Sequence, residues 1–151
     1  MKKLISLFAL MLTFAGLAHG QSVSSDSVFH TYIYNDEYKV YLDINLYAND
    51  VMVPGQEVFG NVPGYLGATR DSRKWLITSA KLVGKNMARL EITNDYGSED
   101  LTAFLEYNPS SKTYTLKQHG GSRLKIVVNR KWLKLPGELE LKPSRRVPSA
   151  W

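Results

Sequence analysis

The sequence predicts an all-β protein: an antiparallel meander of about eight to nine strands that forms a barrel, with a β-sandwich as the alternative. Apolar and polar residues alternate with a period of two in successive segments, and turn residues recur between them. No segment after residue 27 shows the 3.6-residue period of a helix. Short turns between successive long strands place neighbours antiparallel, and closing the sheet removes its exposed edges.

The first hairpin is the clearest element. Val28–Tyr34 is rich in strand-forming residues, and Asn35-Asp36-Glu37 supplies a turn before Tyr38–Tyr47. Strict alternation in the second strand predicts an inward set of Tyr38, Val40, Leu42, Ile44 and Leu46. The same alternation predicts a solvent-facing set of Lys39, Tyr41, Asp43, Asn45 and Tyr47.

The segment from residue 48 to 73 is less regular. Val53-Pro54-Gly55 and Val62-Pro63-Gly64 both fit type II turns, in which the glycine takes the positive φ. We expect short strands to flank these turns, for example near Glu57 to Phe59.

The second half of the chain is a more regular meander. Strands are expected over residues 74–83, 87–93, 101–107, 112–118 and 123–130, with a last strand around Leu139 and Leu141. His119 to Ser122 is expected to form the turn between the strands 112–118 and 123–130. The predicted inward residues are Ala88, Leu90, Ile92, Leu101, Ala103, Leu105, Tyr114, Leu116, Leu124, Ile126 and Val128.

The strand count, the chain length and the meander resemble those of lipocalin-like (calycin) barrels, and the resemblance covers most of the chain after residue 20. It implies a barrel fold. The Gly-x-Trp signature that many lipocalins carry on their first strand is absent, since Arg73-Lys74 precede Trp75. The ligand-binding residues of that family therefore have no counterpart to map onto here.

The first twenty residues have the pattern of a secretory signal peptide. Lys2 and Lys3 precede an apolar run, Leu4–Leu17, and Ala18-His19-Gly20 offers a small-x-small cleavage site. The run is shorter than the ~20 residues of a membrane-spanning helix. We expect cleavage after Gly20, a disordered lead-in over 21–27, one β domain over 28–142 and a basic tail over 143–151. The product is expected to be soluble and either secreted or periplasmic.

The chain contains no cysteine, which excludes disulfides, thiol catalysis and a lipid anchor on cysteine. Its formal net charge is +5, and the charge is uneven. Residues 21–111 hold 7 basic and 12 acidic side chains, whereas residues 112–151 hold 10 basic and 2 acidic ones. Such a basic segment can steer an anionic partner, although lysines also serve on ordinary solvent faces and sheet edges.

The motifs indicate no catalytic residue, no metal site and no cofactor. His119-Gly120-Gly121 resembles an esterase oxyanion loop, but the chain lacks the Gly-x-Ser-x-Gly elbow that such a loop serves. His30 and His119 have no second ligand at useful spacing. Asp95, Glu99 and Asp100 leave calcium open as an alternative to a simple turn. A small hydrolase remains an alternative, because carboxylate pairs are spatial and not visible in sequence.

Two surfaces are candidates for binding. Tyrosines on the first hairpin share faces with polar neighbours, which suits glycan or peptide binding; they are Tyr32, Tyr34, Tyr41 and Tyr47. Basic residues interleave with an aromatic near the C-terminus, which suits an anionic ligand; they are Lys125, Arg130, Lys131, Trp132 and Lys134, followed by Arg145 and Arg146.

The sequence therefore predicts a secreted, non-enzymatic binding module. The sequence does not identify its ligand or protein partner. Two classes of ligand are left open: an anion bound outside the barrel, or a small apolar molecule bound inside it. A glycan-binding sandwich that uses the tyrosines is the alternative. Export argues against nucleic acid as a partner, no membrane-spanning segment is expected after cleavage, and the oligomeric state is left open.

Overall fold

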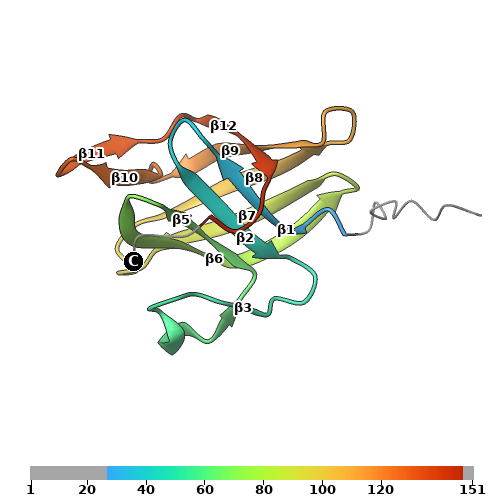
Figure 1. Cartoon of the computed structure of the whole chain (residues 1–151). Helices are drawn as coiled ribbons and strands as arrows, with labels where there is room; N and C mark the ends of the chain where they lie inside the picture. Colours follow the sequence, from blue (N-terminus) through green and yellow to red (C-terminus); the bar gives the residue numbers. More distant parts are fainter. Residues whose placement is uncertain (1–26, 148–151) are drawn as a thin grey trace, which may run out of the picture.

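The computed structural model describes residues 27–147. The predicted signal peptide, its cleavage site and all but one residue of the lead-in lie outside the described residues. Eight strands form a closed antiparallel barrel (Figure 1). They are β1 (His30–Asn35), β2 (Val40–Asn45), β5 (Gly64–Ala68), β6 (Asp71–Gly84), β7 (Met87–Asn94), β8 (Asp100–Asn108), β9 (Thr113–Gly121) and β12 (Glu138–Pro143).

The barrel strands follow one another around the barrel in chain order. β1 pairs with β2 on one side and with β12 on the other, so the last strand closes the sheet onto the first. Every neighbouring pair is antiparallel. This confirms the predicted meander and barrel, and closure excludes the sandwich alternative because a sandwich keeps two separate sheets.

Two excursions interrupt the meander. The first carries β3 (Val51–Met52) and β4 (Asn61–Val62), which pair with each other, and the second carries the ribbon of β10 (Lys125–Val128) and β11 (Lys131–Lys134). Between β3 and β4, Glu57–Phe59 forms a 3-10 helix, so the strand expected there is wrong. The chain needs a tight reversal within eight residues, which a single helical turn provides.

The turn predicted at His119–Ser122 is also wrong. β9 continues through Gly121, and Gly120 and Gly121 pair with Thr102 and Leu101 of β8 across a register shift. Gly121 has a φ of 95°, and a Cβ there would lie 2.5 Å from the carbonyl oxygen of Asp100. The glycines thus allow a bulge and a close backbone approach, not a hairpin.

The strand after these glycines leaves the barrel instead of pairing with β9. Where the chain leaves the barrel, the side-chain amide of Gln118 provides the hydrogen bonds that pairing with β9 would otherwise provide. Its Oε1 accepts the Leu124 N–H at 2.8 Å, and its Nε2 donates to the Pro136 carbonyl at 3.0 Å. One side chain therefore satisfies backbone groups on both sides of the ribbon's base.

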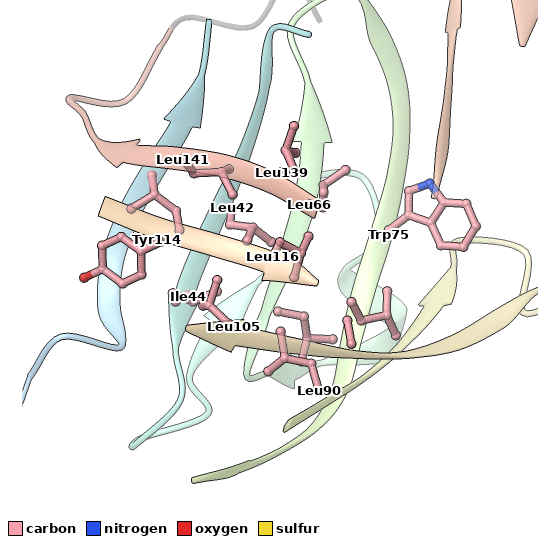
Figure 2. Packing of buried hydrophobic residues seen from close by; sticks show 14 of the residues in the cluster. Leu42, Ile44, Leu66, Trp75, Leu90, Leu105, Tyr114, Leu116, Leu139 and Leu141 are labelled. Carbon is pink, nitrogen blue, oxygen red and sulfur yellow. The ribbon is translucent and has the colours of Figure 1, made fainter. Parts of the chain in front are cut away.

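Apolar side chains fill the barrel interior (Figure 2). The predicted inward positions are confirmed, with Tyr38 and Val128 half-buried against the core and the other members buried. The side chains labelled in Figure 2 come from seven of the eight barrel strands: Leu42, Ile44, Leu66, Trp75, Leu90, Leu105, Tyr114, Leu116, Leu139 and Leu141. Burying each large apolar side chain contributes about 1.5–3 kcal/mol, so this core stabilises the fold without cross-links.

The outer face of β2 is not exposed, which corrects the prediction for Tyr41, Asp43 and Asn45. Their exposed fractions are 5%, 7% and 6%. A second apolar cluster lies on this face, and the β3–β4 excursion supplies two of its members, Val53 and Val62. Alternation predicts which way a side chain points, but it does not predict what a distant segment lays over it. Of the described helical segments, none has the length and apolar character needed to cross a membrane.

Candidate binding site

The β10–β11 ribbon turns at Asn129 and Arg130, whose φ angles are 52° and 63°. Positive φ at both central residues is typical of a type I′ hairpin turn. Cross-strand partners share a face, so Lys125, Val127, Trp132 and Lys134 project to one side of the ribbon. Ile126, Val128, Lys131 and Leu133 project to the other side.

The ribbon is fixed to the barrel at β6. The indole Nε1 of Trp75 donates a hydrogen bond to the Lys125 carbonyl at 3.0 Å, and Asp71 Oδ2 accepts the Val127 N–H at 2.9 Å. Leu124 and Ile126 are buried in the barrel core. Two hydrogen bonds to β6 and the burial of two apolar side chains in the core therefore fix the position of the ribbon on the barrel.

A hollow of about 220 Å³ opens on the outer surface where the ribbon meets β6 and the loop between β7 and β8. Trp132 lies at this hollow with 58% of its surface exposed. The Arg73 guanidinium carbon and the Lys125 Nζ lie 5.0 Å and 4.9 Å from its ring centre. Both distances suit cation–π attraction. The lining residues are Arg73, Lys74, Trp75, Asn94, Asp95, Tyr96, Ser98, Glu99, Lys125 and Trp132.

The 94–99 loop forms the opposite wall. Asn94 shapes it, because its Oδ1 accepts the Ser98 N–H at 2.9 Å and its Nδ2 donates to Ser98 Oγ at 2.9 Å. Tyr96, at 79% exposure, stands at the loop tip. Glu99 Oε1 pairs with Lys125 Nζ at 3.0 Å, and Asp95 Oδ2 accepts the Lys74 N–H at 3.3 Å. These two carboxylates, in the loop for which the sequence leaves calcium open as an alternative, therefore accept hydrogen bonds from protein donors.

Lys74 is the buried charge of the hollow. It is 6% exposed, and within residues 27–147 its Nζ donates one hydrogen bond, to the Ser72 carbonyl at 2.9 Å. Burial lowers the pKa of this lysine because a desolvated ammonium is costly, although Asp71 and Asp95 oppose the shift. An ammonium has three donors, so an anion in the hollow could accept one of the others.

Only some of the predicted cationic site residues lie at the hollow. Lys125 and Trp132 line the hollow, and Lys134 shares their face of the ribbon. Arg130 lies in the hairpin turn, and Lys131 projects to the opposite face. Arg73, Lys74 and Tyr96 were not among the predicted site residues. The run Arg73-Lys74-Trp75 repeats the mixture of basic and aromatic residues seen at 130–134, and it could have pointed to them.

The predicted tyrosines do not form one surface either. Tyr32 and Tyr41 stack with ring centres 5.1 Å apart, and Tyr65 meets Tyr41 edge-on at 5.9 Å. Tyr34 packs against the same outer cluster. Tyr47 lies apart from it and accepts the Phe29 N–H at its hydroxyl oxygen at 3.2 Å. The tyrosines of the outer cluster are thus packed together instead of forming an open row.

Comparisons with family models, curated proteins and solved structures found no match to this chain. Within residues 27–147, no three His, Asp or Glu side chains come together as a metal-binding group.

Proposed function

We propose that this protein is a secreted, non-enzymatic, lipocalin-like barrel that binds an anionic ligand in the outer hollow at Trp132. One observation carries the proposal: an exposed indole lies beside two cations, Arg73 and Lys125, over a hollow that also reaches the buried Lys74. The predicted signal peptide supports export.

The hollow favours a ligand with both a ring and a negative charge. Trp132 and Tyr96 offer exposed aromatic surface for a sugar ring or a flat group. Three cations line the hollow, Arg73, Lys74 and Lys125. Arg73 pairs with Asp71 and Lys125 with Glu99, each through one nitrogen, so both cations keep further N–H donors for an anion. An acidic glycan has both features, so it is the ligand class we assign to the site.

The outer hollow is preferred to the barrel interior for a physical reason. Leu42, Leu90 and Leu116 are among the interior side chains with 0–1% exposure, and they pack against one another in one cluster. An apolar ligand inside would have to displace side chains whose burial stabilises the barrel. The outer hollow is open without any rearrangement of the core.

A binding panel tests the proposal. Sulfated and uronate-containing glycans, neutral glycans and anionic lipid vesicles are titrated at low and at high salt against the protein from Gln21 onward. We expect the acidic glycans to bind, and to bind more weakly at high salt, because the Debye length falls to about 3 Å at 1 M. Binding of neutral glycans alone, unaffected by salt, would contradict the proposal.

Two variants localise the site. Trp132→Ala removes the exposed ring and should abolish binding. Lys131→Ala removes an exposed neighbouring cation that projects to the opposite face of the ribbon, so it should leave binding within about twofold of the wild type, since exposed charges away from a site act weakly. A loss in Lys131→Ala, with binding by Trp132→Ala unchanged, would mean that net charge, and not this hollow, attracts the ligand.

A further inference from the structure

The C-terminal segment after β12 is attached to the outer face of the barrel. It runs from the end of β12 across the first two strands (Figure 1). Ser144 N–H donates to the Tyr32 carbonyl at 3.1 Å, and Val147 N–H donates to the Tyr32 hydroxyl oxygen at 3.2 Å. These bonds bring Arg146 over β2, 103 residues from its partner Asp43.

Arg146 is held by the groups that usually recognise a guanidinium. Its Nη1 and Nη2 donate to Oδ2 and Oδ1 of Asp43, the second at 3.2 Å, so the pair is bidentate. Its guanidinium carbon lies 5.5 Å from the Tyr32 ring centre. Tyr32 is in turn stacked on Tyr41, which fixes the ring for this contact. Three residues from β1 and β2 therefore form one compact receptor for a planar cation.

Asp43 and Tyr41 of the receptor are buried and Tyr32 is partly buried, whereas the occupant is exposed. The Asp43 side chain is 10% exposed, whereas the Arg146 side chain is 69% exposed. Within the described residues, Arg146 is the basic side chain that pairs with Asp43. A buried carboxylate without a partner is costly, so the site requires some cation. The occupant lies on the segment that follows β12, outside the strands of the barrel, where exchange disturbs the barrel least.

Open space continues beside the occupied site. A hollow of about 340 Å³ adjoins Arg146 and is lined by Tyr32, Tyr41 and Tyr65 together with Pro54 and Gly55 of the first excursion. A second hollow, of about 290 Å³, lies at Asp43 and Arg146 on the side of His30 and Asp50. A peptide longer than a single arginine would find further contact surface on both sides.

We propose that Tyr32, Tyr41 and Asp43 form an arginine-binding site, that Arg146 is its resident occupant, and that an arginine on an extended peptide of a partner takes its place. Lys74 lines both the hollow at Trp132 and the 340 Å³ hollow beside Arg146, so the two sites adjoin, but the arginine site does not depend on the function proposed for the first hollow. The tethered arginine competes through its high effective concentration, so the intact chain binds such a peptide weakly. Arginine is preferred to lysine because only the guanidinium matches the carboxylate in two places and lies flat against tyrosine.

The test replaces the resident arginine and supplies one in solution. The probe is a synthetic peptide with the sequence of residues 143–147 and alanine at the position of Arg145, so that it carries one arginine, and its control has lysine at the position of Arg146. Binding is followed by the NMR shifts of the tyrosine rings in the wild type, in Arg146→Ala and in the matched control Arg145→Ala. Arg145 is the adjacent exposed arginine, and its side chain lies outside the lining of both hollows.

We expect Arg146→Ala to bind the arginine peptide at least about tenfold more tightly than the wild type and Arg145→Ala do, because the tethered competitor is gone. The lysine peptide should bind several-fold more weakly. Adding Asp43→Asn to Arg146→Ala should remove the binding. Equal affinity in all three proteins, or equal affinity for both peptides, would overturn the proposal.

A thermal melt covers the case in which Arg146→Ala is destabilised. The arginine peptide should then raise the Tm of Arg146→Ala more than that of Arg145→Ala, since a ligand that binds only the folded state stabilises it. The Asp43→Asn, Arg146→Ala double variant should show no such rise. A peptide that raises the Tm of neither single variant would also overturn the proposal.

Discussion

The indole N–H of Trp75 donates a hydrogen bond of 3.0 Å to the backbone carbonyl of Lys125, 50 residues further along the chain. Trp75 belongs to the barrel core, and Lys125 begins the ribbon that forms one wall of the candidate site. A single side chain therefore couples the position of the binding surface to the packing of the barrel.

Trp75→Phe tests this coupling. Phenylalanine retains most of the apolar burial but leaves the Lys125 carbonyl without its indole donor, so the free energy of unfolding should fall by about 1–3 kcal/mol. Amide exchange at Val127, whose N–H is bonded to Asp71, should become faster as the ribbon loosens. Trp132→Phe, at an exposed position, should change stability by no more than about 0.5 kcal/mol. Equal stability losses in the two variants would contradict the coupling.

Ile126→Asp should destabilise the protein by more than about 3 kcal/mol, because Ile126 is 2% exposed in the barrel core and a carboxylate there is buried without a partner. Lys131→Asp lies on the same face of the ribbon but is exposed, so its effect should stay within about 0.5 kcal/mol. Chemical denaturation measures both changes. Similar midpoints would show that Ile126 is not inserted into the core.

Gly64→Ala should weaken the pairing of β2 with β5. A Cβ at Gly64 would lie 2.5 Å from the Asp43 carbonyl oxygen, a backbone atom that cannot move without disturbing the strand. We expect a loss of about 1–3 kcal/mol in unfolding free energy, typical of an overpacked site. At Gly84 a Cβ has no heavy atom within 4 Å, so Gly84→Ala should be close to neutral. Thermal denaturation of both variants provides the comparison.

Stability should fall at alkaline pH. Burial raises the pKa of Tyr114 to about 12, and its hydroxyl donates to the Val28 carbonyl. An acid with a raised pKa in the folded state stabilises the fold below its unfolded pKa, about 10, and loses that contribution as the pH rises toward 12. Burial also raises the pKa of Tyr65, Tyr41 and Tyr32 in the same direction.

Tyr114→Phe separates this contribution from the others. The variant lacks the hydroxyl, so it should be less stable than the wild type at neutral pH, and the two stability curves should converge between about pH 10 and 12. Denaturant titrations across this pH range measure the difference. A difference that stays constant with pH would contradict the raised pKa.

Much of the barrel could be predicted from local pattern. The alternation in Tyr38–Tyr47 places Leu42 and Ile44 in the core, and the same reasoning places Leu90, Leu105 and Leu116 there. These predictions succeed because a strand's side chains alternate regardless of its neighbours. The turn predicted at His119–Ser122 is wrong because two glycines suit both a turn and a bulge, and only the pairing with β8 distinguishes the two.

The candidate sites could be predicted only in part. Lys125 and Trp132 were identified because they lie close together in sequence, whereas Arg73, Lys74 and Tyr96 reach the same hollow from β6 and the 94–99 loop. Tyr32 and Tyr41 are each predicted as exposed binding residues of the first hairpin, but Tyr41 is 5% exposed and its ring stacks on Tyr32. Their cover by Arg146 depends on a contact across more than a hundred residues, which no local pattern contains.

Local sequence pattern is enough to predict the class of the fold, most of its strands and most of its interior, because period-two alternation and turn residues act over a few neighbouring positions. Three features are visible only in the folded chain: β12 pairs with β1, the ribbon leaves the barrel after Gly121, and Arg146 pairs with Asp43. Those outcomes depend on register and on contacts between distant segments. The free energy of these contacts comes from pairs of residues that are far apart in sequence and meet only in the closed barrel.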